Sequence, residues 1–204
     1  MSSDDYPVLA STTVFAGRVL TLRTDDVRMS DGAVATREVV QHPGAVGVLA
    51  LDGDGNVVLV SQYRHPVRRR LDELPAGLLD VPGEAALAAA RRELAEEAAL
   101  TARRWHVLID LHPSPGMSDE AIRLYLARDL SPALGAAFVA DHEELTLTVS
   151  RVPLGEAVRR ALAGELTNAA AVAGVLAAAH GVASGWAGLR PADAPWPARA
   201  GLGQ

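Results

Sequence analysis

Residues 77–100 read GLLDVPGEAALAAARRELAEEAAL, and the rest of the chain is best understood outward from this stretch. Its alanine-rich second half has the apolar spacing of a short helix, which we expect over residues 84–98. Three acidic side chains crowd the end of that helix: Glu93, Glu96 and Glu97. On a helical wheel they share one strip with Arg92, beside an apolar stripe that faces the core.

The close spacing of Glu93 and Glu97 has two explanations. At a solvated surface the repulsion costs only about 0.2–0.5 kcal/mol, and each acid near the helix C-terminus costs roughly 0.3–1 kcal/mol more. An exposed face, partly offset by an Arg92–Glu96 ion pair, tolerates such penalties. Alternatively, a hard divalent cation such as Mg²⁺ or Mn²⁺ binds the carboxylate oxygens and turns the repulsion into attraction.

The composition of the whole chain excludes several classes of protein. Its 204 residues suit one domain with or without an appendage, and 49% hydrophobic residues allow a real core. The net charge of -6 argues against a non-specific nucleic-acid binder, which needs a basic surface. Because there is no cysteine, disulfides, thiolate zinc sites and cysteine nucleophiles are excluded. The six histidines lack the H-E-x-x-H spacing of a zinc hydrolase, and we expect only His65 and His142 near a site.

The sequence predicts neither a secretory signal at its start nor a membrane span. The first ten residues, MSSDDYPVLA, have neither a basic region nor an apolar stretch, so they do not form a secretory signal. The longest apolar run, AAAVAGVLAAA at 169–179, is too short to span a bilayer. We therefore expect a soluble, cytoplasmic protein without a membrane partner.

The alternation of apolar and polar residues predicts a β-rich beginning and an α/β body. Two strand pairs are expected over 7–40 with a turn at SDG, and a hairpin over 45–64 around DGDGN. Further strands are expected at 105–112, 121–130 and 145–152, and further helices at 154–165 and 168–180. This order predicts an α/β domain with a mixed sheet. The predicted units are a β-rich N-terminal unit (1–43), the main domain (44–185) and a Pro/Gly-rich tail without regular structure (186–204).

The stretch from Gly77 resembles the Nudix box, G-x5-E-x7-R-E-U-x-E-E-x-G-U, where U is a bulky aliphatic residue. The charged positions of the box are filled by Glu84, Arg92, Glu93, Glu96 and Glu97. Two features depart from the pattern. Six residues rather than five separate Gly77 from Glu84, and Ala99 stands where a glycine normally ends the helix. Because of that alanine, we expect the helix to run slightly further, towards Thr101.

Segments outside the box resemble the ADP-ribose pyrophosphatase branch of the Nudix hydrolases, in its actinobacterial form. The resemblance covers roughly residues 35–180 and includes LPAG before the box, the REVV and QYR segments, and Pro115 after it. It implies a Nudix α/β/α sandwich with a mixed β-sheet, preceded by a small β-rich dimerisation unit that makes a homodimer. The branch usually has an aromatic residue where Asp72 stands, so we expect a changed pocket rim.

The activity implied by this resemblance is metal-dependent hydrolysis of ADP-ribose to AMP and ribose 5-phosphate by water. The alternatives are another nucleotide-sugar or dinucleotide substrate, or a non-catalytic nucleotide-binding sensor. Sensors generally lose box glutamates and carry a DNA-binding segment, whereas all three glutamates are present here and only a short tail follows residue 180.

The resemblance also implies the residues that bind Mg²⁺ or Mn²⁺. The expected ligands are the carboxylates of Glu93 and Glu97, with Glu96 as a third and the carbonyl of Ala76 beside them. Arg92 belongs to the catalytic group as the residue that orients these glutamates. Glu84 is interpreted as a partner of Arg92 or, alternatively, as a partner of the helix dipole.

The catalytic base of this branch usually lies in a loop well after the box. DHEE at 141–144 is the acidic cluster in that place, and we expect Glu144, then Glu143, to remove a proton from the attacking water. A solvated loop is the alternative.

Several residues are candidates for substrate binding. Arg64 could bind a phosphate or the terminal ribose through its planar guanidinium, or be a surface arginine. Arg37 and Glu38 resemble the segment that contacts adenine, often from the partner subunit, or are strand-surface charges. Pro115 and Gly116 mark the loop that would face the substrate, and the acidic residues after them could shape the ribose–phosphate end or only cap the loop.

Overall fold

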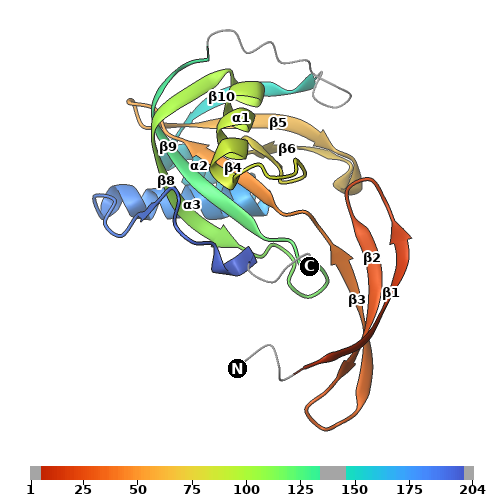
Figure 1. Ribbon diagram of the computed structural model, residues 1–204. Coiled ribbons are helices and arrows are strands. Elements are labelled where there is room, and N and C mark those ends of the chain that lie inside the picture. The colour runs from red at the N-terminus through yellow and green to blue at the C-terminus, as the bar shows by residue number, and fades with distance from the viewer. Residues whose placement is uncertain (1–5, 134–145, 200–204) are drawn as a thin grey trace.

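The computed structural model of the protein describes residues 6–133 and 146–199. Its N-terminal part is a three-stranded antiparallel sheet that projects from the body of the molecule as an arm (Figure 1). The arm consists of β1 (Val8–Ala16), β2 (Thr21–Arg28) and β3 (Val34–Gln41). Gly32, with φ +84°, makes the turn between β2 and β3 at the predicted SDG. The two predicted strand pairs are thus confirmed, with β2 shared between them.

The predicted hairpin over residues 45–64 is wrong. The strands are present as β4 (Ala45–Ala50) and β5 (Asn56–Arg64), and Asp52 and Gly55 form the predicted turn between them. The strands then diverge into different sheets and share only a bridge between Leu51 and Val57. β4 is apolar and buried throughout, and β5 is apolar and buried from Val57 to Val60, so these parts are covered on two faces and paired with other strands along their edges.

Two sheets form the body. The five-stranded sheet has the order β11-β8-β9-β4-β7, in which β4 and β9 are parallel and the other neighbours are antiparallel, so the predicted mixed sheet is confirmed. A three-stranded sheet has the order β10-β5-β6. The remaining strands are β6 (Arg69–Glu73), β7 (Ala76–Leu78), β8 (Leu100–Leu111), β9 (Ile122–Pro132) and β10 (Thr148–Pro153). A short 3-10 turn, His65–Val67, links β5 to β6.

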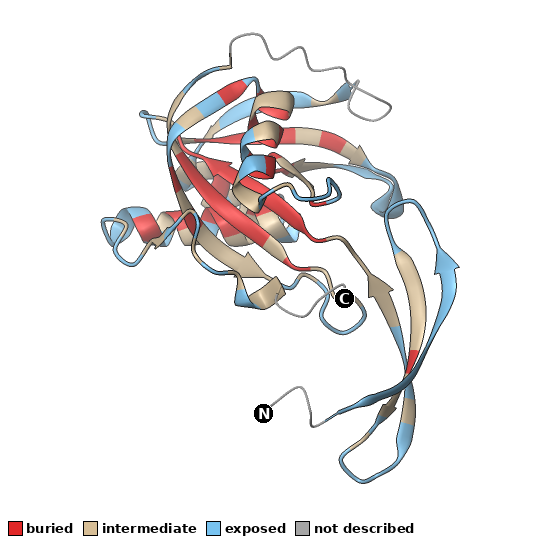
Figure 2. Cartoon of the chain, in the orientation of Figure 1, coloured by how far each residue is buried: buried red, intermediate tan, exposed pale blue. Residues whose placement is uncertain are grey.

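Helices cover both faces of these sheets, as predicted for an α/β/α sandwich. The helix α1 (Ala86–Ala98) packs with Val46 and Val48 of β4 on one face. The helices α2 (Leu154–Leu162) and α3 (Ala169–Ala183) pack with Leu49 on the other. Figure 2 shows the buried residues concentrated in the strands between these layers, whereas every residue of β1 is exposed.

The predicted extension of the box helix towards Thr101 is wrong. The helix α1 ends at Ala98, and Ala99 adopts the left-handed conformation itself, with φ 52° and ψ 38°. Its amide donates to the carbonyls of Ala95 and Leu94. Because β8 begins at Leu100, the chain must turn at once, and that need prevails over the preference of alanine for other backbone angles.

The C-terminal tail is more ordered than predicted. It contains the two-residue strand β11 (Arg190–Pro191), which pairs with Val107 and His106 of β8, and a 3-10 turn at Pro197–Arg199. Among the described residues, no helix is long and apolar enough to cross a membrane.

Candidate active site

The carboxylates of α1 are not all on an exposed face. Glu93 and Glu97 are each only 9% exposed, while the Glu96 side chain is 35% exposed. Both buried residues lie one turn apart on the face that also contributes Leu94 to the core. A solvated surface therefore does not explain Glu93 and Glu97, and two buried carboxylates this close require compensation by positive charge or hydrogen bonds.

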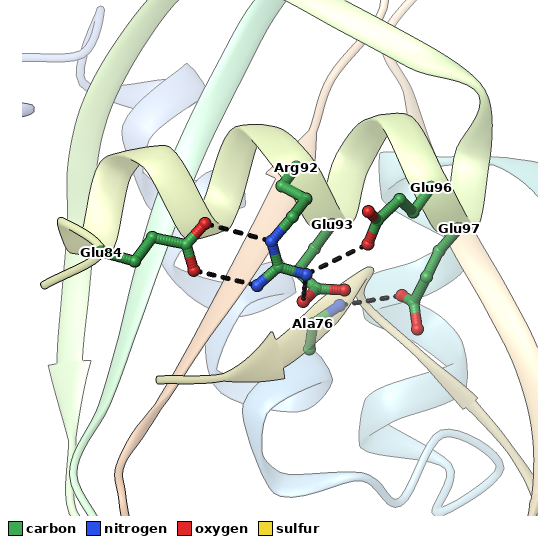
Figure 3. A network of polar contacts seen from close by, with 6 residues as sticks. All are labelled: Ala76, Glu84, Arg92, Glu93, Glu96 and Glu97. Carbon is green, nitrogen blue, oxygen red and sulfur yellow. Dashed lines mark hydrogen bonds and ion pairs between the residues drawn. The ribbon is translucent and has the colours of Figure 1, made fainter. Parts of the chain in front are cut away.

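Arg92 gathers three carboxylates around one guanidinium (Figure 3). Its Nε and Nη2 donate to the two oxygens of Glu84 at 3.1 and 3.0 Å, and Nη1 donates to Glu93 at 2.6 Å and Glu96 at 3.1 Å. The bidentate bond to Glu84 shows that this residue is a partner of Arg92, as predicted. It also lowers the pKa of Glu84, so that carboxylate stays ionised at neutral pH. Arg92 thereby fixes the orientation of Glu93.

The strand β7 lies against the same turn of α1 and supports the other carboxylate. The amide of Ala76 donates to Oε2 of Glu97 at 2.9 Å. The next residue, Gly77, leaves room for Glu93, because a Cβ atom at this position would collide with the Glu93 carboxylate. The first glycine of the box is thus required by close packing between β7 and α1.

A cavity of about 300 Å³ opens beside these carboxylates. Its walls come from β5, β7, the segment after β7, and α1, and its polar lining includes Arg64, Asp80, Arg92, Glu93 and Glu97. Arg64 makes a bidentate ion pair with the buried Glu73 at 3.0 and 2.7 Å, and its own side chain remains 45% exposed. The buried acid orients the arginine at the cavity wall.

A larger cavity of about 720 Å³ adjoins the first along β7. The two cavities share four lining residues: Arg64, Ala76, Gly77 and Leu78. The polar lining specific to the larger one is His42, Glu73, Ser114, Glu120 and Asn168. Most of these residues were not predicted from the sequence, because they come from strand ends and loops that meet only in the fold. Together the two spaces can hold a molecule with a charged group near the carboxylates and a larger part beyond it.

The side chains around the smaller cavity suit a hard divalent cation. Within residues 6–133 and 146–199, no three His, Asp or Glu side chains converge on one point as they stand, since Arg92 binds Glu93 and Glu96 and Ala76 binds Glu97. The available donors are nevertheless carboxylate oxygens on one wall, which Mg²⁺ and Mn²⁺ prefer, and Gly77 keeps the space beside Glu93 open. The donor set fits such an ion.

Other predicted residues lie elsewhere. Arg37 and Glu38 are exposed on β3 and line neither cavity within one chain. Pro115 and Gly116 are exposed in the loop after Ser114, which does line the larger cavity. Asp72 lines neither cavity within one chain and binds Arg160 of α2, so its effect on the pocket rim stays a prediction.

The predicted base residues, Glu143 and Glu144, lie outside the described residues. Of the two histidines expected near a site, His65 lines neither cavity and His142 is also outside the described residues, whereas His42 lies in the wall of the larger cavity. A signal for His42 was present only in its position, at the end of β3 where the arm joins the body.

Comparison with known proteins places these features in a family. The NUDIX domain model matches residues 41–173, and the model of the nucleoside diphosphate sugar hydrolase N-terminal domain matches residues 7–40. The ADP-ribose pyrophosphatase of Mycobacterium tuberculosis is 48% identical over 96% of this chain and 93% of its own length. The methanol dehydrogenase activator of Bacillus methanolicus is 42% identical over 66% of this chain and 75% of its own. A crystal structure of an ADP compounds hydrolase superposes with a TM-score of 0.73 at 23% identity, over 91% of this chain and 99% of that one.

Proposed function

The chain belongs to the NUDIX family, and we propose on this basis that it hydrolyses the pyrophosphate of ADP-ribose to AMP and ribose 5-phosphate. The observation that carries the proposal is the pair of buried carboxylates, Glu93 and Glu97, on the wall of a cavity that adjoins a larger one along β7. The similarity to the M. tuberculosis ADP-ribose pyrophosphatase over nearly the whole chain supports the choice of substrate.

The first task of such a site is to hold two phosphates that repel an incoming nucleophile. Glu93 and Glu97, with Glu96 and the Ala76 carbonyl beside them, would hold Mg²⁺ or Mn²⁺. When bound, the ion would neutralise phosphate charge and lower the pKa of a coordinated water. Arg92 contributes by positioning: its four hydrogen bonds hold Glu84, Glu93 and Glu96 in fixed relation.

Arg64 is the residue best placed to contact a phosphate directly. It lines both cavities at their junction, and the ion pair with Glu73 fixes the orientation of its guanidinium. A planar guanidinium presents paired donors that match phosphate oxygens, which a lysine at this position would not. We assign Pro115 and Gly116 to the loop that borders the larger cavity next to Ser114.

The reaction also needs a base that takes a proton from the attacking water. Glu144, with Glu143 as the second choice, remains our prediction for this role. Such a base typically contributes about 10²–10⁴ in rate. Glu144→Gln and Glu143→Gln test the prediction separately, and wild-type turnover in both variants would place the base elsewhere.

The arm supports a further proposal, that the protein acts as a homodimer. Several of its apolar side chains are exposed: Tyr6, Val8, Leu9, Val14, Phe15, Val19, Leu20 and Val34. Because β1 is exposed along its whole length, a second copy that covers the arm would bury this surface. The partner's arm would then bring Arg37 and Glu38 to the adenine. Light scattering of the purified protein tests the dimer, and a concentration-independent monomer would refute it.

Other substrates of the same class are the alternative, since the arm matches a domain described for nucleoside diphosphate sugar hydrolases and ADP-ribose is one such sugar among several. A panel of ADP-ribose, other nucleoside diphosphate sugars and dinucleotides, each with Mg²⁺ and with Mn²⁺, distinguishes these substrates. We expect the highest kcat/KM for ADP-ribose, with AMP released. Faster hydrolysis of another member would change the substrate, and tight binding of ADP-ribose without hydrolysis would indicate a sensor.

A further inference from the structure

One histidine in the wall of the larger cavity is held in a single orientation by the backbone beside it. The amide of Gly44 donates a hydrogen bond to Nδ1 of His42 at 3.1 Å. Because a backbone N–H can only donate, Nδ1 must be the acceptor, and the proton of the neutral imidazole lies on Nε2. Nε2 has no hydrogen-bond partner within residues 6–133 and 146–199, although the side chain is only 15% exposed. His42 therefore presents an unused donor.

The neighbour of His42 indicates which group this donor would bind. Oε1 of Glu120 lies 3.8 Å from Nδ1, and the Glu120 side chain lines the same cavity. Because this carboxylate lies so close to His42, it would repel a phosphate bound to the histidine. A hydroxyl group suits both residues, because it accepts from the imidazole and donates to the carboxylate. Arg64, at the junction of the cavities, supplies the positive charge for phosphate.

The backbone that fixes His42 is itself held by the C-terminal tail. Nη2 of Arg199 donates to the carbonyl of Pro43 at 3.0 Å. That carbonyl belongs to the same peptide group whose N–H binds His42, since the next residue is Gly44. Arg199 and His42 thus bind the two ends of one peptide dipole. The amide of His42 is held in turn by Asp119, at 2.8 Å.

The tail is fixed where it reaches this peptide. The guanidinium of Arg199 lies 5.7 Å from the ring centroid of Trp196, and Arg123 lies over the same ring at 4.8 Å. Arg123 is 3% exposed and also donates to the carbonyls of Ala194 and Pro195, at 2.7 and 2.9 Å. The position of Arg199 therefore follows from contacts in the body of the protein.

We propose that His42 determines specificity by donating from Nε2 to a hydroxyl of the sugar in the substrate, and that Arg199 is a positioning residue for it through the Pro43–Gly44 peptide. This inference rests on the proposed function for the identity of the substrate. It adds a sugar-hydroxyl contact at the junction of arm and body, on the wall away from the carboxylates of α1.

Two substitutions separate a substrate contact from a structural role. In His42→Asn the side-chain oxygen can still accept from Gly44, but the donor at the Nε2 position is lost. In His42→Gln the amide nitrogen restores that donor. We expect KM for ADP-ribose to rise about 3- to 10-fold in His42→Asn with kcat within about twofold, and His42→Gln to recover KM to within about threefold. His180→Asn, at an exposed position on α3, is the matched control.

Either of two results would overturn the contact: an unchanged KM in His42→Asn, or the same increase in both His42 variants. Product inhibition adds an independent measurement. Loss of a contact to one sugar weakens inhibition by only one of AMP and ribose 5-phosphate, whereas weakening of both or of neither contradicts the proposal.

The role of Arg199 is tested by a double-mutant cycle. We expect Arg199→Gln to raise KM about two- to fivefold with kcat unchanged, and to have no further effect when combined with His42→Asn. Additive effects, or no effect of Arg199→Gln alone, would remove Arg199 from the proposal. Hydrogen exchange at the Gly44 amide should also become faster in Arg199→Gln and stay unchanged in His180→Asn.

Failure of the proposed function can be told apart from failure of this inference. Binding of ADP-ribose is measured calorimetrically in EDTA for the wild type and the His42 variants. If the wild type binds ADP-ribose in EDTA but does not hydrolyse it with Mg²⁺ or Mn²⁺, the proposed function is wrong. The order of affinities of the wild type and the His42 variants then decides the His42 contact. If the wild type hydrolyses ADP-ribose and the His42 variants match it, the inference alone is wrong. If the wild type does neither, both are wrong.

Discussion

Two of the clusters of arginine and carboxylate side chains in the described part of the chain differ in composition and in the groups that complete their hydrogen bonds. In the α1 cluster, one arginine, Arg92, serves three carboxylates, those of Glu84, Glu93 and Glu96. In the Asp110 cluster, two arginines, Arg123 and Arg190, serve the single carboxylate of Asp110. The first has surplus negative charge beside a cavity. The second has surplus donors, which the backbone carbonyls of the tail accept.

This difference distinguishes a ligand-binding site from a cluster with a purely structural role. A cluster whose hydrogen bonds are all satisfied within the protein holds segments together and needs no ligand. A buried cluster with excess charge next to open space is complete only when something else supplies the opposite charge. The α1 cluster should therefore respond to substitution in activity, and the Asp110 cluster in stability.

The largest expected effect is at Glu97, which lies beside the α1 cluster, one turn from Glu93 on the same cavity wall. In Glu97→Gln the side-chain oxygen can still accept from the Ala76 amide, but the negative charge that would hold the cation is lost. We expect kcat/KM to fall roughly 10²–10⁴-fold, with little change in the unfolding temperature. Steady-state kinetics and thermal unfolding measure the two. Glu156→Gln, a carboxylate paired on the surface of α2, is the control and should keep full activity.

A loss of less than about threefold in Glu97→Gln would place the cation elsewhere. A large drop in unfolding temperature would mean that the buried carboxylate of α1 is mainly structural. Either result would erase the contrast between the two clusters.

Arg123→Met should show the opposite behaviour. It leaves Asp110 with only Arg190 and frees the carbonyls of Ala194 and Pro195, so the free energy of unfolding should fall by about 3 kcal/mol. Because the tail positions His42, KM should rise as in Arg199→Gln, while kcat stays within about twofold of the wild type. Urea unfolding and steady-state kinetics measure these effects. A tenfold loss of kcat in folded protein would assign Arg123 to the chemistry.

The same cluster predicts a dependence of stability on pH. Burial raises the pKa of Asp110, but hydrogen bonds and charge from Arg123 and Arg190 more than offset it, and the net pKa is lowered. A carboxyl whose pKa is lower in the folded state stabilises the fold above its ordinary pKa and loses that contribution as the pH falls through the folded value. The stability difference between wild type and Arg123→Met should therefore shrink as the solution is acidified below the ordinary range of Asp.

Glu84→Gln should have an intermediate effect on activity. It tests how far the orientation of Glu93 and Glu96 depends on the ion pair between Glu84 and Arg92. Arg92 would keep Glu93 and Glu96 but lose its bidentate partner, so the orientation of Glu93 would loosen. Loss of such a supporting bond typically costs about 10- to 100-fold in metal affinity. We expect the half-maximal Mg²⁺ concentration for activity to rise by about tenfold, with kcat at saturating Mg²⁺ within about threefold. An unchanged Mg²⁺ titration would limit Glu84 to a structural contact.

The contrast between the clusters also explains what could be predicted from the sequence. The α1 cluster lies within one helix and a few residues before it: helical spacing predicted the Arg92–Glu96 pair, and the resemblance to the box led to Glu84 as a partner of Arg92. The Asp110 cluster joins β8, β9 and the tail, which are separated by 13 and 80 positions along the chain. Local patterns do not report such pairs, and the ordered tail was missed for that reason.

The predicted hairpin over residues 45–64 was wrong for the same reason, because strand partners distant in the sequence are not visible in local patterns. The turn at Asp52–Asn56 is local and was predicted, but the partners of β4 and β5 come from distant strands. The wall of the larger cavity is likewise assembled from five separate regions, and His42 is identifiable there only by its hydrogen bond to Gly44. Burial of Glu93 and Glu97, which argues against a solvated surface as the explanation of the acidic helix, became visible only in the fold.

The smallest expected effect is at the end of α1, where the chain departs from the box by having alanine instead of glycine. Ala99 is exposed and has φ 52°, so a Gly substitution loses no packing and removes the strain of a left-handed alanine, about 1 kcal/mol. Glycine also gains freedom in the unfolded chain, which offsets about 0.4–1 kcal/mol. We therefore expect Ala99→Gly to increase the free energy of unfolding by between zero and about 1 kcal/mol.

Ala88→Gly, exposed within the same helix, is the matched control and should destabilise by roughly 0.5–1 kcal/mol. If both glycines destabilise equally in urea unfolding, the left-handed cap is absent in solution and the helix continues towards Thr101. In that case Glu97 would no longer lie in the last turn of α1, and the geometry that sets this cluster apart from the Asp110 cluster would have to be revised.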